Sequence, residues 1–273
     1  LATMSANMQN AYSEQGSFEI EQQLGRRSTV SIGYQHLRGL HLIAAINQNV
    51  PACVAVGNNN ACRPNPNFAN NSQYSPRADS HYDGLHITYA RRQGAWGDYR
   101  MSYTFSKALN NVGEFFFSTP IDNFNLWRDY GRSDDDQRHR VVFDGNLRAR
   151  GFQLGGVLQY YSSLPMNITT GTNTIQGTAA RPVVNGDYIG RNVGTGSDFF
   201  GINARLSRTF AVTERFRLLA LVEAFNLLNH RNNLTRNGTF GSGSYPGNPS
   251  PAFGQVTAVN DARSLQLALR ITF

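Results

Sequence analysis

The sequence predicts an all-β protein, an antiparallel transmembrane β-barrel segment of about nine strands. Three observations predict this fold class: short segments in which apolar and polar residues alternate, connections that are long and short in turn, and a final strand with one wholly apolar face. A membrane barrel needs such strands, because one wall of each strand faces lipid and the other faces a polar lumen.

The composition fits this fold class. Charged residues make up only 16% of the 273 residues and hydrophobic residues 40%, with a mean hydropathy of −0.42. Soluble domains carry about a quarter charged residues, and here Asn, Gln, Ser, Thr and Gly take their place. No stretch approaches the ~18 apolar residues of a membrane helix, which excludes a helical membrane protein but allows strands of ~9–11 residues.

The expected strands are recognised by apolar residues at every second position. In chain order these positions are Phe18 and Ile20; Val30, Ile32 and Tyr34; Leu85, Ile87 and Tyr89; Tyr99, Met101, Tyr103 and Phe105; Val141, Phe143 and Leu147; Phe152, Leu154, Leu158 and Tyr160; and Phe200, Ile202, Ala204 and Leu206. An eighth strand lies within residues 216–227, which are apolar on both faces except for Arg217 and Glu223 on one of them.

The ninth strand is the last segment of the chain. Every odd position from 265 to 273 is Leu, Ile or Phe, and every even position is polar or small. Outer-membrane barrel proteins commonly end on such a strand with a terminal aromatic residue, so we interpret Leu269, Ile271 and Phe273 as a signal for the barrel-assembly machinery. The alternative interpretation of this segment alone is an edge strand of a soluble β-sandwich.

The connections decide between these two architectures. Long connections are expected near residues 44–78, 109–137, 168–198 and 229–262, and short ones at 25–27, 93–97, 149–151 and 211–214. A sandwich has no reason to sort its loops in this way, whereas an outer-membrane barrel has short periplasmic turns and long extracellular loops. The final strand is then expected to run toward the periplasm, which fixes the direction of every other strand.

Side chains near the short turns and between the apolar positions receive separate predictions. Aromatic residues near the short turns predict a girdle at the lipid–water boundary: Tyr89, Trp96, Tyr99, Phe152, Phe210, Phe216 and Phe273. The arginines beside them are interpreted as solvated turn and lumen charge: Arg26, Arg27, Arg91, Arg92, Arg148, Arg150 and Arg215. The charged residues predicted to face the lumen are Arg100, Arg140, Asp144, Arg205, Arg217 and Glu223.

Several segments together resemble the C-terminal barrel of the Oar-like family of TonB-dependent outer-membrane transporters. They are YDGLH at 82–86, YARR at 89–92, YTFSKA at 103–108, DQRHR at 136–140, SLP at 163–165, RP at 181–182, EAFNLLN at 223–229 and ARSLQLALRITF at 262–273. Their order and spacing, over nearly the whole chain from about Tyr12, carry the resemblance.

The resemblance implies a barrel of about 22 strands in the outer membrane of a Gram-negative bacterium, plugged by an N-terminal domain and energised through TonB. Residues 1–273 would then be the C-terminal portion of that barrel, a fragment without the plug. Nine strands are an odd number for a bacterial barrel, and an unpaired strand edge in lipid leaves backbone groups unsatisfied. We therefore expect preceding sequence to supply the remaining strands.

Other chemistry is weighed against this interpretation. Cys53 and Cys62 lie close together and predict a loop-stapling disulfide in an oxidising compartment, since no nearby residues complete a metal site. The carboxylates at 134–136 lack the glycine and distal glutamate of a helical calcium loop. The family resemblance implies instead that Asp136 and His139 are structural strand-entry residues, hydrogen-bonded to neighbouring strands. The formal charge of +7 is spread over the chain, and we expect no nucleic-acid partner. No serine, histidine and orienting group stand in a recognisable arrangement, so we expect no enzyme, cofactor or metal.

Two other functions stay open. One is a free-standing pore or adhesin barrel, which would need an extra closing strand near residues 2–10. The other is a secreted β-sandwich binding module, which would be soluble without detergent. The Gly-rich segment 238–254 is expected to be a mobile extracellular loop, and the asparagines at 58–60 and phenylalanines at 115–117 to contact a ligand or pack within their own loops.

Overall fold

The computed structural model describes residues 1–53, 60–94, 96–113 and 120–273. The asparagines Asn58 and Asn59 and the run Phe115–Phe117 considered above lie outside these described residues. Within them no helix is long and apolar enough to cross a membrane.

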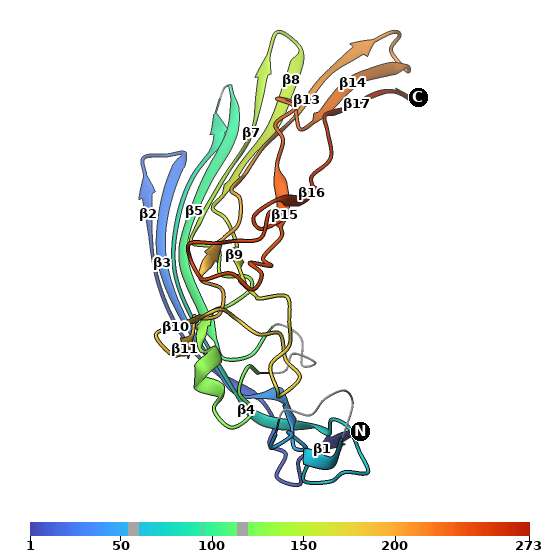
Figure 1. The fold of residues 1–273 in the computed structure, drawn as a ribbon. Helices are drawn as coiled ribbons and strands as arrows, with labels where there is room; N and C mark the ends of the chain where they lie inside the picture. Colours follow the sequence, from blue (N-terminus) through green and yellow to red (C-terminus); the bar gives the residue numbers. More distant parts are fainter. Residues whose placement is uncertain (54–59, 95, 114–119) are drawn as a thin grey trace.

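One large antiparallel sheet dominates the described chain (Figure 1). Its strands are β2 (Tyr12–Leu24), β3 (Ser28–Asn47), β4 (Ser72–Gly94), β5 (Gly97–Asn110), β7 (His139–Ala149), β8 (Phe152–Tyr161), β13 (Phe199–Ala211), β14 (Arg217–Phe225) and β17 (Ser264–Thr272). The spatial order β17-β14-β13-β8-β7-β5-β4-β3-β2 follows the chain without a crossover. The predicted all-β fold and the nine main strands are therefore confirmed in the described part of the chain.

The sheet is open, with β2 and β17 at its two edges in the described residues. Two short strands, β1 (Ala2–Met4) and β6 (Gly131–Arg132), join it beside β4 and β5. The pairing of β1 with β4 is parallel and three residues long, from Ala2 opposite Ser72 to Met4 opposite Tyr74. The segment near residues 2–10 therefore does not supply a strand between the two edges.

All four short turns lie at one end of the sheet, at the top of Figure 1, and the long connections occupy the other end and the concave side. The predicted alternation of connection lengths is thus confirmed, although two strands are longer than expected. β3 continues to Asn47 and β4 begins at Ser72, so the first long connection spans 48–71 and not 44–78. This extension is stabilised because Ala44, Ile46 and Ala78 pack with Leu126 in a small buried cluster.

The long connections contain only short elements. These are η1 (Asn60–Cys62), η2 (Leu126–Asp129), β9 (Pro165–Met166), β10 (Val183–Val184), β11 (Asp187–Tyr188), β12 (Gly194–Thr195), β15 (Asn233–Arg236) and β16 (Val256–Val259). Three separate two-stranded ladders form among them: β10 with β11, β12 with β9, and β15 with β16. Each ladder lies within one connection, and an isolated bridge between Thr169 and Thr239 joins the third long connection to the fourth.

The Gly-rich segment 238–254 differs from the mobile loop that the sequence suggested. Phe240 is only 1% exposed, and its ring lies 5.1 Å from that of Tyr245 and 5.2 Å from that of Phe253. The backbone also returns on itself, since the Gly254 amide donates to the Asn237 carbonyl at 2.8 Å. Glycines and prolines here allow tight turns around one buried aromatic side chain.

Candidate functional site

The register of the sheet aligns the charged residues predicted to face the lumen. In an antiparallel pair, residues directly opposite each other share a face. Arg100 is opposite Asp144 in β5 and β7, and Arg205 is opposite Glu223 in β13 and β14. Arg140 and Arg217 lie an even number of residues from Asp144 and Glu223 on the same strands.

A single row across five strands shows that both pairs point the same way. Asp98 is opposite Asn146, Asn146 opposite Gly155, Gly155 opposite Arg205, and Arg205 opposite Glu223. Because Asp98 and Arg100 are two apart on β5, all six charged residues share one face, which we call the loop-side face. We use this name because the long connections lie over this face: Asn110, on the same face of β5, accepts hydrogen bonds from the Arg191 side chain of the third long connection.

Several of these charges interact directly. Arg100 Nε lies 3.0 Å from Asp144 Oδ1, and Arg205 Nη1 lies 3.7 Å from Glu223 Oε1. The Arg140 guanidinium carbon lies 4.6 Å from the ring centre of Tyr161. Arg100 and Asp144, with Arg92 and Asp98, also line a depression of about 570 Å³ near the short-turn end. Polar, partly paired charge thus covers the concave side of the sheet.

The opposite face, here called the outer face, carries the apolar residues. Met101, Phe143, Leu206, Val222 and Leu267 are all exposed there, at 41–77% of their surface. A soluble protein rarely leaves so continuous an apolar surface in water. Near the short turns the aromatic rings approach one another, with 5.8 Å between Tyr89 and Tyr99 and 6.3 Å between Phe216 and Phe273.

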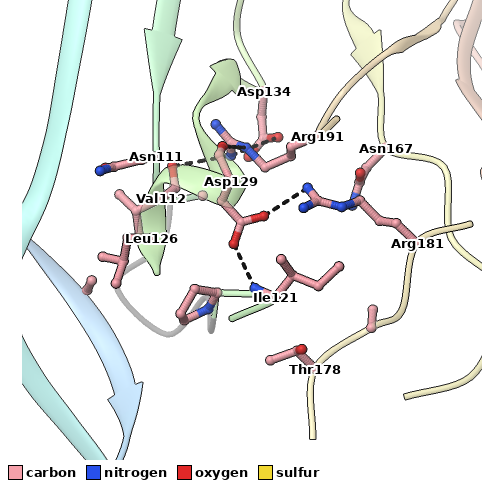
Figure 2. Close-up of a pocket in the computed structure, with 14 residues that line it drawn as sticks. Asn111, Val112, Ile121, Leu126, Asp129, Asp134, Asn167, Thr178, Arg181 and Arg191 are labelled. Atoms are coloured by element: carbon pink, nitrogen blue, oxygen red, sulfur yellow. Dashed lines mark hydrogen bonds and ion pairs between the residues drawn. The ribbon is translucent and has the colours of Figure 1, made fainter. Parts of the chain in front are cut away.

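A second polar centre lies where the long connections meet over the loop-side face (Figure 2). Asp129 ends the 3-10 helix η2, which is capped by the Asn125 side chain accepting from the Trp127 amide. Asp129 Oδ1 lies 2.8 Å from Arg181 Nη1, and both side chains are less than a tenth exposed. Asp129 Oδ2 accepts a 2.7 Å hydrogen bond from the Ile121 amide.

Burial is the strongest influence on the pKa of Arg181. It lowers the pKa of the Arg181 guanidinium, while the Asp129 carboxylate acts in the opposite direction. Desolvation disfavours the charged form of a base and a nearby opposite charge favours it. Arg181 also donates to the Arg128 carbonyl at 2.9 Å. The pair therefore joins the connection 162–198 to the connection 111–138.

Arg191 makes a second bridge between the same connections and the sheet. Its guanidinium donates to the carbonyls of Asp129 at 3.1 Å, Val112 at 3.2 Å and Asn110 at 3.1 Å, and to the Asn110 side chain. Together with Arg181, Asp129 and Leu126 it lines a cavity of about 270 Å³. A guanidinium with five donors suits this role, since it can hold several carbonyls in one plane.

In the carboxylate run at 134–136, Asp136 is structural, as expected. Asp136 is completely buried, and its Oδ2 lies 2.6 Å from Arg132 Nε and 3.0 Å from Arg138 Nε. Its Oδ1 accepts from the Ala108 amide of β5 at 2.7 Å. The described residues contain no group of three or more metal-ligating side chains.

Comparison with known families identifies the chain. A model of the outer membrane beta barrel domain matches residues 1–189 and 188–266. The chain belongs to this family. An outer-membrane β-barrel accounts for the two faces of the sheet, because the exposed apolar outer face then lies against lipid. The protein belongs in the Gram-negative outer membrane.

Solved structures share this barrel fold. The outer membrane transporter YddB from Escherichia coli superposes with a TM-score of 0.65 at 10% identity, over 97% of this chain and 33% of that chain. The FrpB iron transporter from Neisseria meningitidis superposes with a TM-score of 0.58 at 10% identity, over 100% of this chain and 33% of that chain. The copper transporter OprC gives a TM-score of 0.51 at 9% identity, over 98% and 31% of the two chains.

This outer-membrane barrel chain therefore spans about a third of the length of the transporters it resembles. No curated protein matches its sequence. Its structural neighbours are outer-membrane transporters and receptors, and at this level of identity the similarity shows the fold alone.

The sequence analysis did not single out the polar centre formed by Asp129, Arg181 and Arg191. Asp129 and Arg191 were not considered, and Arg181 entered only as part of the segment at 181–182. The one available signal was the presence of arginines inside long polar connections, since a guanidinium there can bind backbone carbonyls and carboxylates of neighbouring loops. Cys53 and Cys62, in the first long connection, are joined by a disulfide with Cα atoms 5.5 Å apart.

Proposed function

We propose that this chain supplies the barrel wall, lumen lining and four extracellular loops of a TonB-dependent outer-membrane transporter of the Oar-like type. The parent protein would import a substrate that the loops select. One observation carries this proposal: an open sheet with a charged loop-side face aligns over 97% of its length with a third of a known outer-membrane transporter. The remaining two thirds would provide the other strands and the plug.

In this proposal the loop-side face is the lumen. Arg100, Arg140, Asp144, Arg205, Arg217 and Glu223 would line it and face the N-terminal plug of the parent chain. The depression around Arg100 and Asp144 lies at the short-turn end, which would be the periplasmic end. Exposed charge on both partners of the Arg100–Asp144 pair leaves each able to accept a second partner, which favours contact with a polar plug surface.

The other proposed partners follow from the same placement. The outer face would contact outer-membrane lipid, and TonB would act on the plug of the parent and not on this segment. Leu269, Ile271 and Phe273 at the end of β17 would be read by the barrel-assembly machinery. These three side chains are among the most exposed apolar ones, at 65–91%.

The alternatives fit less well. A secreted β-sandwich needs two packed sheets, whereas the main strands of the described chain form a single one. A free-standing pore or adhesin barrel needs its edge strands β2 and β17 to meet, and β1 does not bridge them.

Crosslinking in the outer membrane tests the lumen assignment. A photoreactive amino acid at position 144 is expected to crosslink to the N-terminal plug within the same polypeptide, mapped by mass spectrometry. The matched control is position 143, the neighbouring residue on the outer face, which is expected to crosslink to lipid. An antibody against residues 238–254 is expected to detect a protein about three times the 30.3 kDa of this chain.

Two results would overturn the proposal. A closed barrel of about 30.3 kDa in outer membranes would favour the free-standing pore or adhesin. Equal crosslinking of positions 143 and 144 to lipid would remove the lumen assignment of the loop-side face.

A further inference from the structure

Arg208 breaks the pattern of the outer face. On β13 the outer-face positions are Phe200, Ile202, Ala204, Leu206, Arg208 and Phe210, so one arginine stands in an otherwise apolar row. Its register partners, Phe152 on β8 and Ala220 on β14, confirm that it lies on the outer face. A charge on the lipid face of a barrel is unfavourable at the bilayer centre and tolerated near the interfaces.

The side chain of Arg208 contacts two aromatic rings. Its guanidinium carbon lies 4.7 Å from the ring centre of Phe152 and 5.1 Å from that of Phe210. Both rings belong to the predicted girdle near the short turns. The position that a Cβ would take on Gly151 lies 3.7 Å from Arg208 Nε. Arg208 therefore extends toward the short turn between β7 and β8, as an arginine does when its head seeks the headgroup level.

Among the described residues, the side chain of Arg208 has no hydrogen-bond or ion-pair partner. Both aromatic rings lie within cation–π distance of the guanidinium, and its N–H donors are not used by other groups in the described part of the chain. A guanidinium that lies against aromatic rings and keeps its N–H donors free is suited to bind a phosphate through two parallel hydrogen bonds.

An apolar groove adjoins this arginine on the outer face. It has a volume of about 610 Å³ and crosses β8, β13, β14 and β17. Its floor and walls include Leu206, Ala220, Val222, Leu267 and Leu269, with Phe152, Phe210 and Arg208 at one side. A hydrocarbon chain can fill such a groove, whereas a soluble polar ligand would leave its apolar walls unpartnered.

The charge of the surrounding rim also favours an anionic ligand. The arginines in or beside the four short turns are Arg26, Arg27, Arg91, Arg92, Arg148, Arg150 and Arg215, and the acidic residues there are Asp98 and Glu214. Positive charge next to a bilayer surface attracts anionic lipid headgroups.

We propose that Arg208 and this groove form a binding site for an anionic glycerophospholipid of the leaflet on the short-turn side. The phosphodiester would accept hydrogen bonds from the Arg208 guanidinium beside Phe152 and Phe210, and one acyl chain would occupy the groove beside Leu206 and Val222. The inference depends on the outer-membrane placement and not on transport.

Native mass spectrometry of the intact protein, extracted from outer membranes and delipidated in detergent, tests the site. The probe is dioleoyl phosphatidylglycerol, whose adducts are titrated to give an apparent Kd. Replacing the charge in Arg208→Leu is expected to weaken binding about tenfold or more, the usual effect of losing a charge-assisted bidentate contact. Filling the groove in Val222→Trp is expected to weaken it although the charge remains.

Arg270→Leu is the matched control. Arg270 lies opposite Leu219 on the loop-side face, one row from the outer-face pair Ala220–Leu269 that is aligned with Arg208. The Arg270→Leu substitution removes the same charge at nearly the same level along the barrel axis but on the other face. Binding is expected to stay within about twofold. Heat-modifiable mobility on gels verifies that each variant is a folded barrel.

Three outcomes would overturn the proposal. Unchanged binding in Arg208→Leu and Val222→Trp would mean that the groove holds no lipid specifically. An equal loss in Arg208→Leu and Arg270→Leu would assign the attraction to the overall charge of the rim. Equally tight binding of soluble glycerol 3-phosphate would make this a phosphate site without a role for the acyl groove.

Discussion

Arg181 and Asp129 form a buried ion pair, 2.8 Å between Nη1 and Oδ1, that joins two long connections of an outer-membrane barrel segment. Asp129 and Arg181 are 52 residues apart in sequence, and the described parts of the two connections share no strand pairing with each other. The pair, with Arg191, therefore explains how long polar loops can be packed over the loop-side face (Figure 2).

Removing one partner of this pair is expected to loosen both connections. Arg181→Leu leaves the Asp129 carboxylate buried without its counter-charge, which typically costs about 3–5 kcal/mol. The amide of Ile121, which donates to Asp129, is expected to exchange hydrogen faster. Exchange measured by mass spectrometry on the intact protein, with the exposed-loop variant Arg231→Leu as control, checks this.

The double variant Asp129→Leu with Arg181→Leu sharpens that prediction. Because no unpaired charge remains, its loops are expected to be more protected than in either single variant. Equal exchange in the double and single variants would contradict the assignment of stability to the pair.

Asp136→Asn is expected to destabilise the entry to β7. The substitution keeps an oxygen for the Ala108 amide but removes the charge that holds Arg132 and Arg138. We expect the free energy of local opening to fall by about 3 kcal/mol, because two arginines then lose a fully buried counter-charge. Denaturant-dependent exchange of peptides covering residues 104–110 measures it, and unchanged exchange would show that Arg132 and Arg138 do not depend on Asp136.

Glu223→Gln is expected to change little. The Arg205–Glu223 pair is 3.7 Å apart, with 49% of the Arg205 side chain and 26% of the Glu223 side chain exposed, and solvent-accessible pairs contribute about 0–1 kcal/mol. A destabilisation well above this range, measured as the free energy of unfolding in urea, would mean that the pair is buried against another protein segment.

Breaking the Cys53–Cys62 disulfide is expected to act on the first long connection only. A closed loop of this size contributes roughly 2–3 kcal/mol by restricting the unfolded chain, and the native connection has further anchors, since the Asn49 side chain donates to three carbonyls. The variant Cys53→Ser with Cys62→Ser is expected to raise exchange within residues 48–71 and leave β13 and β14 unchanged. Increased exchange in those strands would contradict a local role.

The barrel wall was predictable because its side chains alternate between lipid and lumen, which gives the sequence a period of two residues. The alternation in β5, from Tyr99 to Phe105, and in β17, from Leu265 to Ile271, states directly which residues face which way. The short turns at 25–27 and 149–151 were equally predictable, because each contains a glycine. In the structure Gly25 and Gly151 take the positive φ angles that favour glycine.

The polar centre in the long connections was not predictable, because its contacts follow no regular spacing in the sequence. Asp129, Arg181 and Arg191 meet only after four strands have been paired, and each lies in a connection whose composition is generic. Arg208 was missed for a different reason. The strand was recognised by its apolar residues at alternate positions, and the charged residue that shares their face on β13 was not considered.

The most direct test of the central claim is the accessibility of a spin label along β13 in outer membranes. Labels are placed singly at positions 202 to 207, in a background with serine at Cys53 and Cys62. The account predicts that labels at 202, 204 and 206 are relaxed by oxygen, which concentrates in lipid, and that those at 203, 205 and 207 are relaxed by a water-soluble nickel complex. Uniform accessibility, or alternation with the opposite phase, would contradict a barrel wall whose outer face lies in lipid.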